Sequence, residues 1–213
     1  IYVLVDAAAS GYTVVVKVVD NWGAPLNNVT LRLIRHTGRL VVGIKQTNES
    51  GIAVFENLPM DTYTLNGWIN GTFGLGIMSF RVDGDEKLLW KTDMFAKVHF
   101  KFYCIDGMTP LDNGMLNMTT VFESTGLIIK YTVPVSSGEA ELKIITQYWE
   151  ISDDGLSAVG HLFNHYNLDV YDSDNSLIMR AHLWGPTLTP FIEVVTDKAS
   201  PFIEGKKILH YST

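Results

Sequence analysis

Four asparagines stand in the triplet N-x-S/T, which is the acceptor for N-linked glycans: Asn28, Asn48, Asn70 and Asn117. No proline occupies a middle position, and average composition produces only about one or two such triplets in a chain of this length. We expect all four at or beside turns and strand ends, where a glycan has room. They predict an extracellular glycoprotein, and the alternative is a fortuitous set.

An acidic cluster, "DVYDSDNS", gathers oxygen ligands of the type that Ca²⁺ prefers: Asp169, Asp172, Asp174 and Asn175. It lacks the glycine and the closing glutamate of the helical calcium loop. The same residue types crowd ordinary turns, because their side chains cap backbone amides. The cluster is therefore either a weak calcium candidate or a solvated turn, and the sequence predicts no other metal site.

The histidines offer no convincing metal or catalytic centre. His161 and His165 lie four positions apart, but the glycine before them and "YNLDVYD" after them favour a strand or loop, where such residues lie about 13 Å apart. The sequence contains no glycine-rich phosphate loop, nucleophile elbow or haem attachment motif. We predict a protein that is not an enzyme and has no cofactor.

Composition narrows the class of protein further. The chain has 213 residues, 46% of them apolar, one cysteine and a formal net charge of −7. The charge and the lack of basic clusters exclude a nucleic-acid partner, and one cysteine cannot form a disulfide within the chain. No apolar run reaches the roughly 18 residues of a membrane span. Because the chain starts at Ile1, we expect a mature chain or a piece of a longer one.

Apolar residues recur with the period of β-strands. In "YTVVVKVVD", Val14, Val16 and Val18 share one face. Similar runs of five to nine residues follow, separated by turn residues at intervals of about 8 to 12. No helical period is sustained anywhere. The pattern predicts an all-β protein with a sandwich or barrel architecture.

The turn "DNWGAPLNNVTLRL" is followed 84 to 87 positions later by a second copy of the same layout. Lys17 is matched by Lys101, "PLNN" at 25–28 by "PLDN" at 110–113, and Gly51 by Gly138. A period near 85 residues fits duplicated small domains. We therefore predict an N-terminal strand at 1–9, a first β-sandwich at 10–92 and a second, divergent β-sandwich at 93–213.

The first copy resembles a known family. Its "D-x-x-G-x-P-L-x-N-V-x-L" and the later "T-N-x-S-G-x-A-x-F-x-N-L-P-x-x-x-Y-x-L" at 47–65 are similar to carboxypeptidase-regulatory-like, or transthyretin-like, Ig-like β-sandwiches. The resemblance implies that Gly51 turns a hairpin, that Ala53 and Phe55 point inward and that Tyr63 packs near a strand end. It also implies tandem structural domains of cell-surface or filament proteins, and we expect an archaeal source. The second copy departs at "ELKIITQYWEI".

Sandwiches of this type also form Lys–Asn isopeptide bonds, as collagen-adhesin B-repeats do. The resemblance places Lys17 and Lys101 in the first strands, where the reacting lysine lies. The alternative is that both side chains extend from a strand face to water.

The first segment, "IYVLVDAAAS", is apolar and precedes the first sandwich strand. Ile1, Tyr2, Val3, Leu4 and Val5 are the expected interface residues if this strand is donated to a neighbouring subunit. The alternatives are an edge strand of its own domain and a strand left over from an upstream domain. The sequence favours the second domain as the acceptor.

We therefore predict a glycosylated structural subunit of an extracellular filament or surface layer, a homopolymer that assembles through strand exchange. The alternative is a carbohydrate- or partner-binding module. Its candidate platforms are the five tryptophans: Trp22, Trp68, Trp90, Trp149 and Trp184.

Overall fold

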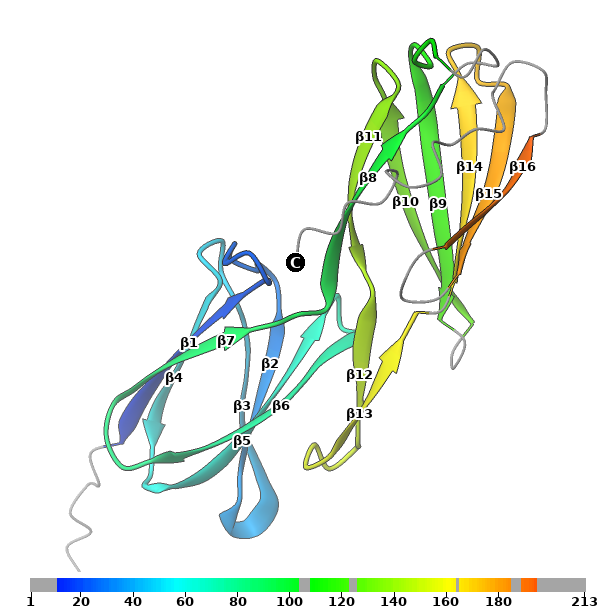
Figure 1. Ribbon diagram of the computed structural model, residues 1–213. Helices are drawn as coiled ribbons and strands as arrows, with labels where there is room; N and C mark the ends of the chain where they lie inside the picture. The colour runs from blue at the N-terminus through cyan, green and yellow to red at the C-terminus, as the bar shows by residue number, and fades with distance from the viewer. Residues whose placement is uncertain (1–10, 104–107, 123–125, 164, 185–188, 195–213) are drawn as a thin grey trace, which may run out of the picture. The chain divides into compact units, whose positions relative to one another are not determined.

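The protein folds almost entirely as β-strands (Figure 1). The computed structural model describes residues 11–103, 108–122, 126–163, 165–184 and 189–194. Within these ranges the one helical segment is the short 3-10 turn η1 (Thr37–Arg39). The all-β prediction is confirmed, and so is the strand period that supports it. Val14, Val16 and Val18 of the first strand are fully buried, whereas Lys17 between them is exposed.

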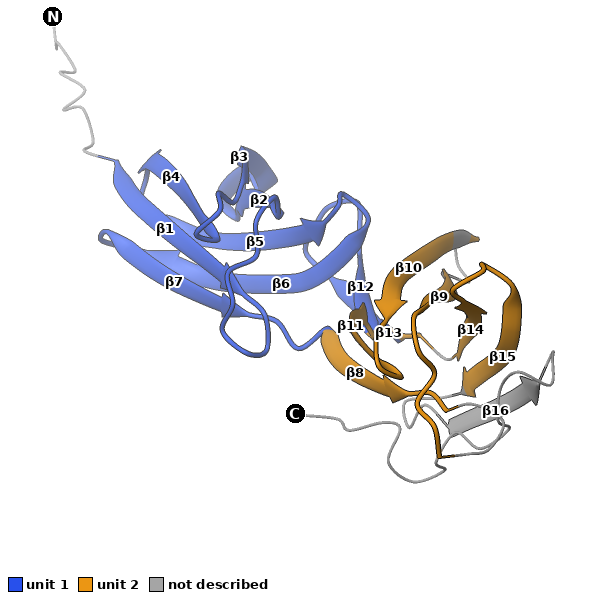
Figure 2. Cartoon of the chain, turned by 90° about the horizontal axis from the view of Figure 1, so that it is seen from above, with its two compact units in different colours: residues 1–94, 147–161 blue, residues 95–146, 162–213 orange. Residues whose placement is uncertain are grey.

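The chain forms two compact units, coloured separately in Figure 2. The first contains residues 1–94 and 147–161, and the second contains 95–146 and 162–213. The strands of the first unit are β1 (Tyr12–Val19), β2 (Thr30–Arg35), β3 (Leu40–Gln46), β4 (Ile52–Leu58), β5 (Asp61–Ile69), β6 (Phe73–Val82), β7 (Glu86–Lys91), β12 (Gln147–Ile151) and β13 (Ala158–Leu162). They make a three-stranded sheet, β4-β1-β7, and a six-stranded sheet, β13-β12-β6-β5-β2-β3.

The second unit has a similar plan. Its strands are β8 (Phe95–Lys101), β9 (Gly114–Phe122), β10 (Leu127–Val135), β11 (Glu139–Ile145), β14 (His165–Asp172), β15 (Leu177–Trp184) and β16 (Thr189–Val194). They make a five-stranded sheet, β10-β9-β14-β15-β16, and the pair β11-β8. In chain order, β8, β9, β10 and β11 correspond to β1, β2, β3 and β4, and β14 and β15 correspond to β5 and β6.

The repeated sequence landmarks make the same hydrogen bonds in both units. In the first unit, the Val18 amide donates to the Gly51 carbonyl at 2.8 Å, and the Val18 carbonyl accepts from the Leu26 amide at 3.0 Å. A side chain on Gly51 would come within 2.5 Å of the Val18 carbonyl, and the φ angle there is +73°. Glycine is required on both counts.

In the second unit, the Phe102 amide donates to the Gly138 carbonyl at 2.7 Å, and the Phe102 carbonyl accepts from the Leu111 amide at 2.9 Å. Gly138 has a φ angle of +77°, and a Cβ there would lie 2.7 Å from the Phe102 carbonyl. The same geometry therefore starts each unit. This explains why the turn with "PLNN" at 25–28 is repeated as "PLDN" at 110–113.

The residues that the family resemblance singled out take the expected places. Ala53 and Phe55 are buried in β4, and Tyr63 is fully buried in β5. The Tyr63 hydroxyl donates to the Pro59 carbonyl at 2.7 Å, which closes the turn between these two strands.

The sequence predicts a single boundary between residues 92 and 93. In the structure the chain crosses between the two units three times, after residues 94, 146 and 161. After β11 the chain does not enter the next strand of its own unit. Residues 147–161 instead form a hairpin, β12 and β13, that extends the six-stranded sheet of the first unit beyond β6 (Figure 1). The corresponding link in the first repeat, between β4 and β5, is only Pro59–Met60. The hairpin is thus an insertion in the second repeat that completes the first unit.

Candidate functional site: the strands that complete the first unit

The loop of the 147–161 hairpin covers the outer face of the six-stranded sheet. Leu65 lies in the core, so its neighbour Asn66 points to the opposite face, yet Asn66 is fully buried. Its Nδ2 donates to the Gly155 carbonyl at 2.8 Å, and its Oδ1 accepts from Arg32 Nε at 3.1 Å. A buried amide without partners is destabilising. The hydrogen bond to Gly155 therefore favours one position of the loop on the sheet.

The turn of the hairpin is shaped to approach this surface. Gly155 has a φ angle of +71°, and a Cβ there would lie 2.4 Å from Asn66 Oδ1. Asp154 Oδ1 accepts from the Ser152 hydroxyl at 2.6 Å and from the Leu156 amide at 3.0 Å. These two bonds, the hydroxyl first, hold the pKa of Asp154 below its ordinary value. The turn is therefore most stable with an ionised Asp154.

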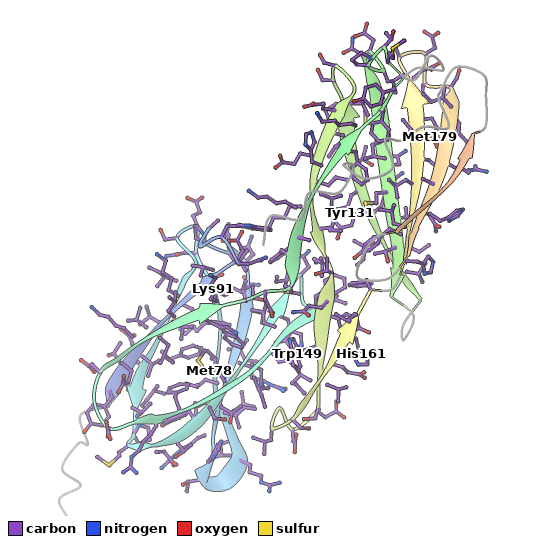
Figure 3. All side chains as sticks on the ribbon, in the orientation of Figure 1. Met78, Lys91, Tyr131, Trp149, His161 and Met179 are labelled. Atoms are coloured by element: carbon purple, nitrogen blue, oxygen red, sulfur yellow. The ribbon has the colours of Figure 1, made fainter. Side chains whose placement is uncertain are left out.

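Trp149 fixes the register of the hairpin on β6. It lies opposite Gly74, where a Cβ would come within 2.1 Å of the Trp149 carbonyl oxygen. A Cβ on Gly76 or Gly160 would lie 3.5 Å or 3.3 Å from the indole ring. Glycines on both neighbouring strands thus leave room for the tryptophan, which Figure 3 labels on β12.

A cavity of about 300 Å³ lies beside this ring, within the first unit. It is lined by Leu75, Gly76, Ile77, Trp90, Lys91, Thr92, Asp93, Trp149 and Ala158. Trp149 is 37% exposed, and Asp93 Oδ1 accepts from Gln147 Nε2 at 2.6 Å. The cavity combines an accessible aromatic ring with the Asp93 carboxylate, and the Gln147 amide bonded to that carboxylate lies outside the lining.

The histidine pair is separated by the fold. His161 lies in β13, where its ring stacks on Tyr148 at 4.9 Å and its Nε2 is 3.2 Å from Glu150 Oε2. His165 starts β14 in the second unit. Among the residues that the structure describes, no group of three or more His, Cys, Asp or Glu side chains is placed to hold a metal ion.

Three of the four candidate glycan sites lie at turns, where the sequence places them. Asn28 precedes β2, Asn48 lies between β3 and β4, and Asn70 lies between β5 and β6, all exposed. Asn117 does not lie at a turn or strand end. It is the fourth residue of β9, an interior strand of the five-stranded sheet. Its side chain is half-buried, and its Oδ1 accepts from the Thr132 hydroxyl at 2.7 Å. The reason is that β9 already begins at Gly114, three residues before Asn117.

The acidic cluster is divided between a turn and a strand face. Asp172 Oδ1 accepts from the amides of Asp174 and Ser176, at 3.0 and 2.9 Å, and Asn175 adopts a φ angle of +60° in the same turn. Asp169 lies three residues earlier in β14, where its carboxylate contacts Arg180 Nε at 3.1 Å. The carboxylates do not converge, and the geometry is that of a capped turn.

Neither first-strand lysine has an asparagine as its register partner. Lys17 is exposed and lies opposite Ile52 and Leu89. Lys101 lies opposite Glu139, with Nζ 3.2 Å from a carboxylate oxygen. The hydrogen bond from Lys101 is the largest of the causes that lower the pKa of Glu139.

The remaining candidates are distributed as follows. Ile1–Val5 lie outside the described residues, as does the side chain of Trp184. Trp90 is buried, and Trp68 carries the Arg32 guanidinium over its ring at 5.0 Å. No helix in the described ranges is long and apolar enough to span a membrane.

Comparison with known proteins agrees with this architecture. Residues 11–66, from the start of β1 into β5, match the family model described as SpaA: Prealbumin-like fold domain. Prealbumin is another name for transthyretin, so the match supports the expected transthyretin-like β-sandwich fold for this part of the chain. No curated protein matches the chain.

Several solved structures match much of the chain, each with a TM-score below 0.5. The shaft pilin spaA from Lactobacillus rhamnosus GG is 9% identical with a TM-score of 0.46, over 82% of this chain and 93% of the pilin. The minor pilin GBS52 of Streptococcus agalactiae is 13% identical with a TM-score of 0.38, over 72% and 91%. A streptococcal ancillary pilin is 13% identical with a TM-score of 0.34, over 72% of this chain and 58% of that pilin.

Proposed function

We propose that the protein is a non-enzymatic structural subunit of an extracellular filament, pilus-like or thread-like, that polymerises by strand exchange between copies. In this proposal Ile1–Val5 form the donated strand. The exposed sequons Asn28, Asn48 and Asn70 carry N-linked glycans. The archaeal source, the carboxypeptidase-regulatory-like subtype and the surface layer as an alternative assembly remain predictions from the sequence.

One observation supports the proposal most strongly: the first unit is completed by strands from elsewhere in the chain. The 147–161 hairpin adds β12 and β13 to the edge strand β6. The prealbumin-like match ends at residue 66, so these strands lie outside the matched domain. A sheet that is extended in this way within one chain can be extended in the same way by another copy.

Deletion of residues 1–9 tests the strand exchange. We expect folded, soluble monomers that do not form filaments in electron micrographs, because the donated strand is missing. The nine-residue peptide, when added back, is expected to occupy the acceptor without restoring polymers. Normal assembly of the truncated protein would refute strand exchange, and loss of folding would assign the segment to its own domain.

The mass of the native protein tests the extracellular assignment. We expect at least two of the four sequons to carry glycan, with occupancy at Asn28, Asn48 and Asn70 above that at Asn117. The reason is that Asn117 lies within the interior strand β9, where its side chain is bonded to Thr132. A measured mass equal to the bare chain of 23.8 kDa would contradict the glycoprotein assignment.

The cavity beside Trp149 favours a second candidate function, the binding of a saccharide. In this function a sugar ring stacks on the exposed indole of Trp149, and the Asp93 carboxylate in the cavity lining accepts hydrogen bonds from the sugar hydroxyls. Screening on a glycan array tests it. We expect binding that is lost in Trp149→Ala and retained in Trp149→Phe, and the absence of any glycan ligand would exclude this function.

A further inference from the structure

The strand β3 forms an open and apolar edge of the first unit. In the described part of the chain, β2 is its only sheet neighbour, and β3 lies at the end of the sheet opposite the hairpin (Figure 1). Four large apolar side chains are exposed along it: Leu40 by 57%, Val41 by 52%, Val42 by 39% and Ile44 by 60%. A Cβ on Gly43 would lie 3.0 Å from the Phe55 ring, so this position of β3 faces the core. Edges of this kind pair readily with an added strand.

The corresponding strand of the second unit is protected. β10 also ends its sheet and pairs with the second strand of its repeat. However, an exposed Lys130 interrupts its apolar residues and an exposed Pro134 has no amide to donate, whereas the lysine of β3, Lys45, follows the apolar stretch. Of the end strands in the described ranges, β13 has only five residues, and Gly160 and His161 interrupt its apolar side chains. Neither β10 nor β13 therefore offers an uninterrupted apolar edge like that of β3.

We propose that β3 is the acceptor edge for Ile1–Val5 of a second copy of this chain. This inference rests on the proposed function, and it names the first unit as the acceptor where the sequence favoured the second. The apolar stretch Leu40–Ile44 has five residues, as does Ile1–Val5, so a paired strand covers it completely.

The flanking charges also match. Asp6 follows the apolar donor, and the acceptor stretch lies between the exposed bases Arg39 and Lys45. A parallel strand brings Asp6 to Lys45, and an antiparallel strand brings it to Arg39. Either direction therefore pairs opposite charges at the end of the added strand, which supports cross-strand pairing. Each copy then offers one donor and one acceptor, a head-to-tail arrangement that generates filaments when it does not close into a ring.

Site-specific cross-linking in the full chain tests this assignment. A photoreactive residue replaces Val3, and the protein is assembled from an equal mixture of ¹⁵N-labelled and unlabelled chains. We expect cross-links between labelled and unlabelled chains that map to residues 40–46. Cross-links within one chain would show that the segment covers its own β3, and cross-links to β8 or elsewhere would place the acceptor outside β3. Both results overturn the proposal.

A pair of substitutions separates this inference from the proposed function. The double variant Val42→Lys and Ile44→Lys places charges in the acceptor edge, and we expect the polymer fraction to fall by at least about tenfold while the strand content stays unchanged. The matched control is Ile128→Lys on β10, which replaces a side chain that is 65% exposed. It should polymerise as the wild type does.

If both variants polymerise normally but the 1–9 deletion does not, strand exchange survives and β3 is not the acceptor. If the deletion also polymerises, the proposed function itself fails.

Discussion

The link between the fourth and fifth strands differs sharply between the two units. In the first it is Pro59–Met60, a turn closed by the Tyr63 hydroxyl. In the second the chain leaves after β11, forms the 147–161 hairpin on the other unit and returns at β14. The second repeat therefore contributes two strands, β12 and β13, to the first unit. It keeps its own fold, although its insertion adds these two strands to the six-stranded sheet of the first unit.

Replacing residues 146–164 by the Pro-Met link of the first repeat removes this difference and has the largest expected effect. We expect the first unit to lose more than about 3 kcal/mol of stability, because the β6 pairing, the Trp149 packing and the Asn66 partner are lost together. Hydrogen exchange of the β6 amides measures it. Unchanged protection of β6 would show that the hairpin is not part of the first unit.

Gly155→Ala weakens the hairpin without removing it. We expect a loss of about 2 kcal/mol, since alanine is strained at a φ angle of +71° and its Cβ would contact Asn66 Oδ1. The control is Gly84→Ala, where a Cβ meets nothing within 4 Å and φ is not positive. Urea denaturation compares the two. Equal stabilities would mean that the loop does not dock on Asn66.

The sequence predicts the two β units but not the place of the 147–161 hairpin. Strand alternation and the pairs Gly51 with Gly138 and Pro25 with Pro110 suffice to find two β units, because backbone conformation and close packing restrict those positions locally. The hairpin could not be assigned, since "QYWEI" predicts a strand but not its partner. Its one signal is the departure from the family pattern after residue 145.

The openness of β3 shows the same limit. "LVVGIKQ" has the pattern of a strand, but only the topology places it at the end of a sheet with its apolar side chains exposed. Asn66 and Gly155 are similar: neither belongs to a motif, and their 2.8 Å hydrogen bond spans 89 residues. Long-range pairing of this kind leaves no local trace in a single sequence.

Acid is expected to have the smallest effect on the hairpin. The pKa of Asp154 is lowered in the folded protein, so its contribution is complete above its ordinary pKa of 3.8 and is lost as the pH falls through the lowered folded value. Ser152→Ala removes the main cause of this shift. We expect the difference in thermal midpoint between wild type and variant to shrink from pH 5 to pH 2. A difference that stays constant would exclude Asp154 as the titrating group.

Cryo-electron microscopy of the assembled native protein tests the account most directly. We expect unbranched filaments in which Ile1–Val5 of each subunit form a strand beside a sheet edge of the next subunit, with β3 as that edge. Two results would contradict it. One is a protein that remains monomeric under all conditions, and the other is a polymer in which Ile1–Val5 stay within their own chain and no strand is added to a neighbour's sheet.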